Sequence, residues 1–590
     1  SKPYKALISI SFLLVTSFIC FLLLSHIVSK AVKFREIMGN NGSKKNQNQA
    51  LPIHTTFNFP SPLPPFPQGK SAFAGGVINL GGGLKIRRIS SFNKIWTTHE
   101  GGPSNLGATF FEPSPLPQGF FSLGHYCQPN NKPFFARILV GRDDSLAGDA
   151  LKKPVDFTLV WTSEKSNIKR DTDGYIWSPT PPDGYRAVGH VVTTSSEKPS
   201  VDRVRCVRAD LTEQSEKETW IWGLKDSVDD NGFNIFSFRP TRRDVTAAGV
   251  SVGTFVALQA TNSPLPFLCL RNSASIFAAM PDVSQISTLF RTYAPLIYFH
   301  PKEKFLPSSV NWYFSNGALL FNKSDESKPV PIDLNGTNLP QGGQNDGGFW
   351  LDLPIDGGAK EKVKHGDLQS CQVYLRIKPM IGGTFTDITI WIFFPFNGPA
   401  TAKVGIIDIP FRKIGEHVGD WEHITLRISN FTGELWKVYF AQHSKGEWID
   451  ASSLEFEKGN KVVAYSSLNG HASYSKPGLV MQGGGEIGLK NETAKSGMVL
   501  DTGASSIEIA AEYLGEEAVA EPAWVNYFRQ WGPKIEYQIA EEMEKVEKLL
   551  PGRLKEAFKQ FMNRLPDEIL GQEGPTGPKL KDSWNGDERS

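Results

Sequence analysis

The sequence predicts a mainly β protein: a pseudo-threefold, β-prism-like or β-trefoil-like domain, then a β-sandwich domain, then C-terminal helices. The 590 residues are several times the roughly 100–200 residues of one domain. The chain also holds 55 Gly and 40 Pro, and 11% of its residues are aromatic, a composition that favours strands and turns. Short segments that alternate between apolar and polar residues indicate the strands themselves.

A 65-residue repeat runs through the first half of the chain. Each unit has an aromatic-Pro segment, a turn glycine and a short apolar strand, at residues 111–125, 177–190 and, more faintly, 238–253. Gly119, Gly184 and Gly249 are evenly spaced, since 184 − 119 and 249 − 184 both equal 65. Three equal units predict a closed body over residues 57–280 with these glycines in equivalent turns. His125 and His190 recur with the repeat, either as a ligand-binding pair or as a repeated structural position.

Charge and cysteine content exclude several classes of function. Lys and Arg number 63 against 61 Asp and Glu, and no cationic run is interleaved with aromatics, so we expect no nucleic acid as partner. The five cysteines contain no Cys-x-x-Cys pair and predict neither a disulfide framework nor a zinc finger. No nucleophile elbow, phosphate-binding loop or dinucleotide fingerprint occurs in a strand-turn-helix setting.

The amino-terminal segment contains an uncharged apolar run over residues 6–29, longer than the roughly 20 residues that cross a bilayer as a helix. We therefore expect a transmembrane anchor over residues 1–35 and a flexible linker, rich in Asn, Gln, Lys and Gly, over residues 36–56. Three basic residues follow the run and two precede it, which favours a cytoplasmic body. The alternative is that the run is a spurious or incomplete leader.

The second half is predicted to be a β-sandwich over residues 281–532. Its clearest strands are residues 388–395 (ITIWIFFP) and 421–428 (WEHITLRI). Apolar residues at near-helical spacing then predict amphipathic helices over residues 533–566, packed either on the body or against a membrane or partner. The Gly-, Pro- and charge-rich residues 567–590 predict a disordered tail.

Several of these segments resemble the plant members of the vacuolar protein sorting-associated protein 62 family. They include residues 293–301 (YAPLIYFHP), 468–474 (LNGHASY) and 521–534 (EPAWVNYFRQWGPK), and the resemblance covers roughly Phe57 to Tyr537. The Pro-Pro-x-Gly-Tyr sequence of the repeat also resembles segments of the large lipid-transfer vacuolar sorting protein 13 family. The resemblance implies a connection with the vacuolar or endomembrane system and transfers no assigned activity.

Residues 416–423 (EHVGDWEH) are the best candidate for a site. Side chains alternate along a strand, so Asp420 and Glu422 should point the same way, with Trp421 in the core, and a preceding turn can bring His417 alongside. Two carboxylates and an imidazole can bind a divalent cation, and the oxygen donors favour magnesium or calcium over zinc. The alternatives are a structural hydrogen-bonded cluster and metal-assisted catalysis.

The same stretch resembles the Gly-His-Arg-His-Asp-Trp-Glu signature of the necrosis- and ethylene-inducing-like plant toxins, a β-sandwich family with a metal at that site. The resemblance implies that the first imidazole and the two carboxylates are metal ligands. Two positions depart from it: Gly419 replaces the second His, and Asn397 stands where the toxins carry another ligating Asp. His471 is a candidate fourth ligand or general base, or else a buried, hydrogen-bonded histidine.

Two functional hypotheses follow. The first is a membrane-associated binding or adaptor protein, not an enzyme, linked to vacuolar or endomembrane protein sorting, whose partners are a membrane and a lipid headgroup, glycan or protein ligand. The alternative is a toxin-like or metal-dependent hydrolytic protein that acts on membrane lipid or glycan. The alternative requires secretion and an exposed edge at residues 417–422.

Overall fold

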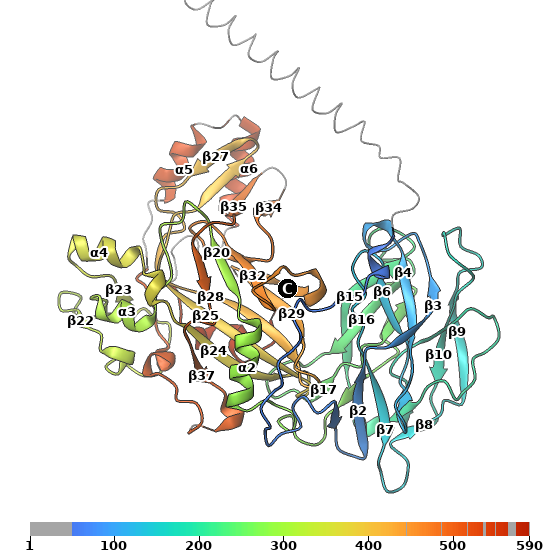
Figure 1. The fold of residues 1–590 in the computed structure, drawn as a ribbon. Coiled ribbons are helices and arrows are strands. Elements are labelled where there is room, and N and C mark those ends of the chain that lie inside the picture. The colour runs from blue at the N-terminus through green and yellow to red at the C-terminus, as the bar shows by residue number, and fades with distance from the viewer. Residues whose placement is uncertain are drawn as a thin grey trace, which may run out of the picture. The chain divides into compact units, whose positions relative to one another are not determined.

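The computed structural model describes residues 50–443, 445–484, 487–515, 517–534, 539–548, 550, 552–564 and 574–588. Pro52–Ser590 forms one compact unit, separate from Ser1–Leu51. Strands dominate this unit, with a few short helices among them (Figure 1). The prediction of a mainly β protein is therefore confirmed. The division of the unit near residue 280 stays a prediction.

One set of three antiparallel sheets in the first half shares a hydrophobic core. Their strand orders are β3-β4-β6, β12-β10-β9 and β15-β16-β18. Trp96, Ile176 and Trp222, one from each sheet, lie in a single hydrophobic core. The strands are β3 (Phe92–Thr97), β4 (Ala108–Pro113), β6 (Tyr126–Pro129), β9 (Asp156–Thr162), β10 (Tyr175–Thr180), β12 (Val191–Thr193), β15 (Ser215–Gly223), β16 (Asn234–Pro240) and β18 (Phe255–Leu258).

A second set of three sheets also shares one core. Its orders are β1-β2-β7-β5, β11-β13-β8 and β14-β19-β17, and Val140, Val207 and Leu270 contribute to the common core from one sheet each. The strands are β1 (Val77–Asn79), β2 (Leu84–Ile89), β5 (Phe121–Ser122), β7 (Ile138–Asp143), β8 (Leu151–Lys152), β11 (Tyr185–Arg186), β13 (Cys206–Arg208), β14 (Thr212–Glu213), β17 (Gly249–Val250) and β19 (Cys269–Arg271).

Three positions spaced by the repeat length meet at one point. They are Gly124, Gly189 and Thr254, where 189 − 124 and 254 − 189 both equal 65. A Cβ on Gly124 would lie 2.8 Å from Thr254 Cγ2, and one on Gly189 would lie 2.6 Å from Thr254 Cβ. The third unit therefore supplies the side chain that occupies the space left by two glycines. Whether this body is a prism or a trefoil stays a prediction.

The turn glycines are equivalent in only two of the three units. Gly119 and Gly184 have φ of 76° and 79°, a region that glycine tolerates best. Gly249 is absent from the residues with positive φ and begins β17. The prediction of three equivalent glycine turns is therefore wrong for the third unit. Glycine is needed there for close packing instead, because a Cβ would lie 2.4 Å from Pro240 Cβ.

The repeated histidines lie inside this body. His125 and His190 are each 1% exposed, and the His125 backbone N–H donates to the His190 carbonyl at 2.9 Å. The ring Nδ1 of His125 accepts a hydrogen bond from the Val192 N–H at 3.1 Å. Desolvation, aided by the charge of Arg203, lowers the pKa of His125 to about 3, so the imidazole stays neutral. These contacts support the structural interpretation of the pair.

A six-stranded sheet is the central element of the second half. Its order is β30-β29-β28-β25-β24-β37, and every pairing is antiparallel except that of β24 with β37. The predicted strands over residues 388–395 and 421–428 lie within β25 and β28. The strands are β24 (Val373–Met380), β25 (Phe385–Asn397), β28 (His417–Ser429), β29 (Leu435–Gln442), β30 (Lys445–Asp450) and β37 (Ser506–Ala510).

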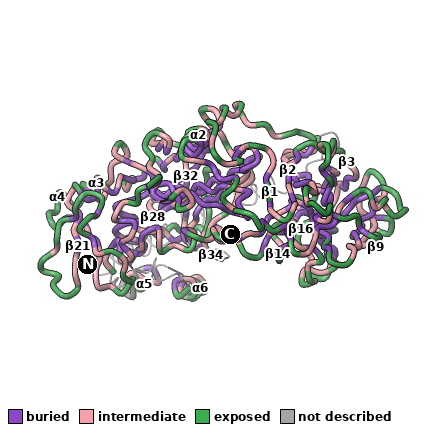
Figure 2. Tube along the Cα trace, turned by 90° about the horizontal axis from the view of Figure 1, so that it is seen from below, coloured by how far each residue is buried: buried purple, intermediate pink, exposed green. Residues whose placement is uncertain are grey.

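One face of this sheet packs against a second sheet and a helix. The second sheet has the order β31-β32-β20-β36, with β33 paired to β32. Ile424 of β28, Phe299 of β20 and Leu289 of the helix α2 belong to one hydrophobic cluster. Figure 2 shows the buried stretches gathered around β28 and β32. The elements are α2 (Val283–Tyr293), β20 (Leu296–Phe299), β31 (Phe456–Glu457), β32 (Lys461–Ser466), β33 (Ser473–Tyr474) and β36 (Val499–Asp501).

The opposite face is covered by aromatic residues from distant parts of the chain. Trp421 of β28 packs there with Trp524 and Trp531, at ring-centroid distances of 5.3 and 5.1 Å. A small sheet and two helices flank this cluster. They are β21 (Leu319–Asn322), β22 (Val330–Pro331), β23 (Phe349–Asp352), α3 (Val310–Ser315) and α4 (Gly357–Lys364). With both faces covered, β25 is buried along nearly its whole length.

A four-stranded sheet carries the last two helices. Phe558 of α6 is fully buried and packs with Val404 and Leu489 of the sheet. The buried side of α6 therefore packs on the protein body. The elements are β26 (Thr401–Val404), β27 (Ile407–Pro410), β34 (Gly478–Gly484), β35 (Ile487–Thr493), α5 (Ile539–Glu547) and α6 (Gly552–Met562).

A row of charged side chains crosses the aromatic face of the six-stranded sheet. Lys378, Asp387 and Arg427 are register partners on β24, β25 and β28, and all three are buried. Arg427 makes a two-pronged ion pair with Asp387, Nε to Oδ1 at 2.9 Å and Nη2 to Oδ2 at 2.8 Å. Taken alone, this row buries two cations against one carboxylate, which is costly in a low-dielectric interior.

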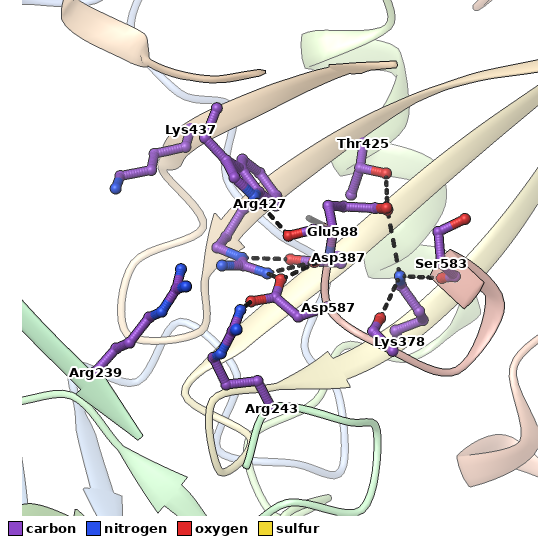
Figure 3. Close-up of polar contacts among 12 residues, drawn as sticks. Arg239, Arg243, Lys378, Asp387, Thr425, Arg427, Lys437, Ser583, Asp587 and Glu588 are labelled. Atoms are coloured by element: carbon purple, nitrogen blue, oxygen red, sulfur yellow. Dashed lines mark hydrogen bonds and ion pairs between the residues drawn. The ribbon is translucent and has the colours of Figure 1, made fainter. Parts of the chain in front are cut away.

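Residues 574–588 complete this row, although the sequence analysis assigned them to a disordered tail. Asp587 binds Arg427 and Arg243, each at 2.5 Å, and Glu588 accepts from Thr425 at 2.6 Å and lies 3.4 Å from Lys378 (Figure 3). The tail prediction is wrong for these residues. Composition alone could not reveal that unpaired buried cations elsewhere in the fold require these two carboxylates.

None of the helices in the described ranges is long and apolar enough to cross a membrane. The predicted anchor over residues 1–35 lies outside the described residues, as does nearly all of the predicted linker over residues 36–56.

We predict that Glu588→Gln lowers the free energy of unfolding by about 3 kcal/mol at pH 7. Burial alone would raise the pKa of Glu588. The charges of Lys378 and His423 outweigh this effect and lower the pKa to about 2, below its usual value of 4.5. A depressed carboxyl pKa adds stability above the unfolded-state value, and this stability is lost as the pH falls towards 2.

Urea unfolding at pH 7 and pH 3 measures this effect, and the difference between wild type and variant should shrink at pH 3. The matched control is Asp226→Asn, because this carboxylate is exposed. An equal loss of stability in both variants, or a difference independent of pH, would contradict the prediction.

Candidate functional site

The candidate site lies at the start of β28, where this strand pairs with β25 but not with β29. The β28–β29 ladder begins at Ile424 and Phe440, so residues 417–423 lie beyond it. The β25–β28 register pairs Phe394 with Asp420 and Phe396 with Val418, and leaves Gly419 out of the ladder. Gly419 has φ +71°, and a Cβ on it would lie 2.3 Å from the Trp531 carbonyl oxygen. This backbone cannot accommodate the second His of the toxin signature.

Asp420 and Glu422 point away from the aromatic face to which Trp421 belongs. Trp421 is a core residue, 5% exposed, as predicted. The two carboxylates and His417 line a cavity of about 420 Å³. The alternation expected from the strand period holds from Asp420 to Glu422. The extra residue Gly419 shifts it by one position, so that Val418 and Trp421 both lie in the aromatic cluster.

His471 reaches Asp420 from the loop that follows β32. Its Nδ1 lies 3.0 Å from Asp420 Oδ2, and its ring stacks on Phe394 at 3.9 Å between centroids and 7° between planes. Asn469 and His471 have φ of 65° and 55°, so the loop holds two non-glycine residues in the left-handed region. Burial by itself would raise the pKa of Asp420, but the His471 hydrogen bond and the charge of His417 outweigh it, and the pKa is lowered.

Glu303 fixes this loop, a role that the sequence did not indicate. Its carboxylate accepts hydrogen bonds from the N–H groups of Lys304 and Phe305, each at 2.8 Å, and of Asn469 at 2.7 Å. Its Oε2 also lies 4.0 Å from His471 Nε2. The histidine is thus held between two buried carboxylates from distant segments. No local signal around residue 303 could have revealed this pairing, since its partners are more than 160 residues away.

Asn397 closes the other side of the site and is the register partner of His417. Its Nδ2 donates to the Gly415 carbonyl at 2.7 Å and to the Gly398 carbonyl at 3.1 Å. The side chain therefore ties together the two chain segments that lead into β28 and out of β25. This is a structural use of the amide.

The prediction of metal binding is corrected by this geometry. Across the described residues, no group of three or more His, Cys, Asp or Glu side chains is arranged to hold a metal ion. His471 lies flat on Phe394 and already uses Nδ1 towards Asp420, and Asn397 holds its own loop. The residues present therefore do not fit the expected magnesium or calcium ion.

Residues from the carboxyl-terminal segment also line this cavity. They are Leu580, Lys581, Asp582, Ser583, Asp587 and Glu588. The charge of Lys581 contributes to the lowered pKa of Asp420. Their Gly-, Pro- and charge-rich composition predicts a disordered tail and gives no local signal of a place in the site.

Comparison with known families gives one match over nearly the whole chain. The model of the family described as "Vacuolar protein sorting-associated protein 62" matches residues 53–588. The chain belongs to this family. The match confirms the resemblance noted in the sequence and includes the segment 574–588 that completes the charged row. No curated protein sequence matches the chain.

Two solved structures similar to this chain come from other organisms. GNIP1Aa from Chromobacterium piscinae is 19% identical to this chain, with a TM-score of 0.27. The match covers 35% of this chain and 40% of GNIP1Aa, so the chain spans about two fifths of that protein. Necrosis and ethylene inducing protein 2, from the causal agent of cocoa's witches' broom disease, is 16% identical, with a TM-score of 0.18. This match covers 32% of this chain and 67% of that protein. The second agrees with the local motif resemblance. Scores this low establish no functional likeness.

We predict that Gly419→Ala lowers the free energy of unfolding by about 2 kcal/mol or more, because the new Cβ would meet the Trp531 carbonyl oxygen in a left-handed backbone conformation. Thermal and urea unfolding measure the loss. Gly497→Ala is the matched control, since a Cβ there meets nothing within 4 Å. Equal stability of the two variants would show that β28 tolerates a side chain at this bulge.

Proposed function

We propose that this protein is a binding or adaptor protein of vacuolar or endomembrane sorting, peripherally associated with membranes, that recognises a hydroxyl-rich headgroup, as in a glycan or glycolipid. One observation carries the proposal. Asp420 and Glu422 present two carboxylates on the same side of β28 to a cavity of about 420 Å³, a volume typical of small-molecule sites.

The chemistry of the cavity suits hydroxyl groups. Ionised carboxylates accept hydrogen bonds only, and the hydroxyls of a sugar or inositol ring donate them. The lowered pKa of Asp420 keeps this carboxylate ionised at neutral pH. Asn491, which also lines the cavity, is 4% exposed and has a side-chain Nδ2 with no hydrogen-bond partner among the described residues. Such a buried donor is costly unless a ligand oxygen satisfies it.

The sorting role comes from the family, whose description names vacuolar protein sorting. In this proposal the first half is a prism-like or trefoil-like recognition body for a protein ligand, and the second half is a β-sandwich that carries the headgroup site. No specific observation in the described residues favours the toxin-like or hydrolytic alternative.

We predict that Glu422→Gln and Asp420→Asn each weaken headgroup binding by about 10- to 100-fold, since a charge-assisted hydrogen bond is worth about 1.5–3 kcal/mol. Co-flotation with vesicles measures this, using phosphatidylcholine vesicles with and without a galactosyl- or inositol-bearing lipid. Wild type should float only with the second kind.

The control is Asp183→Asn, because this carboxylate is exposed and outside the cavity. The proposed function would be contradicted if both cavity variants floated as wild type does. It would also be contradicted if wild type floated equally with vesicles that contain and that lack the galactosyl- or inositol-bearing lipid.

A further inference from the structure

A second cavity, of about 510 Å³, lies between the first half and the six-stranded sheet. Strands β6, β7, β15 and β16 line it on one side, and β28, β29 and β30 on the other. Six aromatic residues in its wall are only half-buried: Tyr126, Phe135, Trp220, Phe385, Trp436 and Trp448. The cavity therefore offers partly accessible aromatic surface, and its volume is sufficient for a small organic molecule.

Arg137 contributes an unsatisfied guanidinium to this cavity. The side chain is only 5% exposed, yet Nε, Nη1 and Nη2 all lack a hydrogen-bond partner among the described residues. The guanidinium carbon lies 4.2 Å from the Phe135 ring centroid and 4.4 Å from that of Trp436. The two rings therefore hold the cation through their faces and leave its hydrogen-bonding capacity unused.

The carboxylate nearest to Arg137 is already used by another cation. Glu434 Oε2 lies 3.8 Å from Arg137 Nη2, but the same oxygen pairs with Arg88 and accepts from Thr432 at 2.8 Å. Burial, followed by repulsion from Arg88, lowers the pKa of Arg137 well below its usual value. Five donor protons in a buried fork normally find acceptors, so this group is unusual.

The other cations of the cavity wall are paired. Arg88, Lys132, Arg239, Arg427 and Lys437 each have a carboxylate within 3.5 Å, whereas Arg137 does not. Figure 3 shows Arg239 and Lys437 on the side of Arg427 away from Lys378. The carboxylate partners therefore neutralise these five cations, and Arg137 is the cation of the described wall that remains to receive an anion.

We propose that this cavity binds an amphipathic small molecule that carries a phosphate or carboxylate on an apolar body, with the oxyanion on the Arg137 guanidinium and the apolar body against the tryptophans. The planar fork of arginine matches two oxygens of a carboxylate or phosphate. The half-buried rings of Trp436 and Trp448 supply the apolar surface for the rest of the ligand. This site is separate from the Asp420 cavity and independent of the function proposed for it.

The test compares four probes on the full chain by isothermal titration calorimetry and tryptophan fluorescence. Decyl phosphate and decanoate carry both features, decanol has only the apolar body, and inorganic phosphate has only the oxyanion. We expect decyl phosphate or decanoate to bind at least about tenfold more tightly than decanol or inorganic phosphate. The better of the two anionic probes identifies the oxyanion. Equal affinity for decanol and both anionic probes would overturn the proposal.

The deciding variant is Arg137→Met, which keeps an unbranched side chain between the two rings and removes the charge. We expect at least about tenfold weaker binding of the preferred anion, unchanged binding of decanol, and a Tm of the unliganded chain equal to or above that of wild type, because an unpaired buried charge is removed. The control, Arg186→Met, changes an exposed arginine and should bind as wild type does.

Undiminished anion binding by Arg137→Met would overturn the proposal. A variant that binds neither decanol nor the anion and melts far below wild type would also count against it, by assigning Arg137 a structural role. If Arg137→Met does not fold, the wild-type comparison of decyl phosphate and decanoate with decanol decides the matter.

Discussion

The structure depends on a charge balance buried on one face of the six-stranded sheet. Lys378 lies on β24 and Arg427 on β28, with Asp387 between them on β25. Two carboxylates from outside the sheet complete the balance: Glu588 pairs with Lys378, and Asp587 pairs with Arg427. Removing one partner of a buried ion pair costs about 3–5 kcal/mol, because the remaining charge cannot be solvated. The segment 574–588 is therefore part of the core rather than an addition to its surface. Through Arg243 it also joins the sheet to the first half.

The same segment connects this balance to the candidate site. Residues 580–583, Asp587 and Glu588 line the cavity that Asp420 and Glu422 face, while His471, beside Glu303, contacts Asp420. The site is thus built by four stretches of chain far apart in sequence. The hydrogen bond from His471 and the neighbouring charges lower the pKa of Asp420, and the geometry suits hydrogen-bond acceptance better than metal ligation.

Local patterns predicted what depends on local geometry. The alternation around Trp421 placed one aromatic in the core and two carboxylates on the opposite side, because strand side chains alternate whatever the strand packs against. The repeat length predicted that equivalent positions recur, and Gly124, Gly189 and Thr254 do meet. It could not predict that Gly249 would be needed for contact with Pro240 instead of for a turn. The metal prediction failed because it too depended on a contact between distant residues: the orientation of His471 is set by stacking on Phe394.

The sequence by itself determined the mainly β class, the repeat, the strands of the central sheet and the family, because these follow from residue periodicity and from motifs along the chain. The tertiary structure decided three further features: the burial of Asp587 and Glu588, the positioning of Asp420 by His471 and Glu303, and the unsatisfied Arg137 between two rings. Each involves contacts between residues far apart in sequence. Whether a charge is paired, stacked or solvated depends on which distant segment packs beside it, and that is set only when the chain folds.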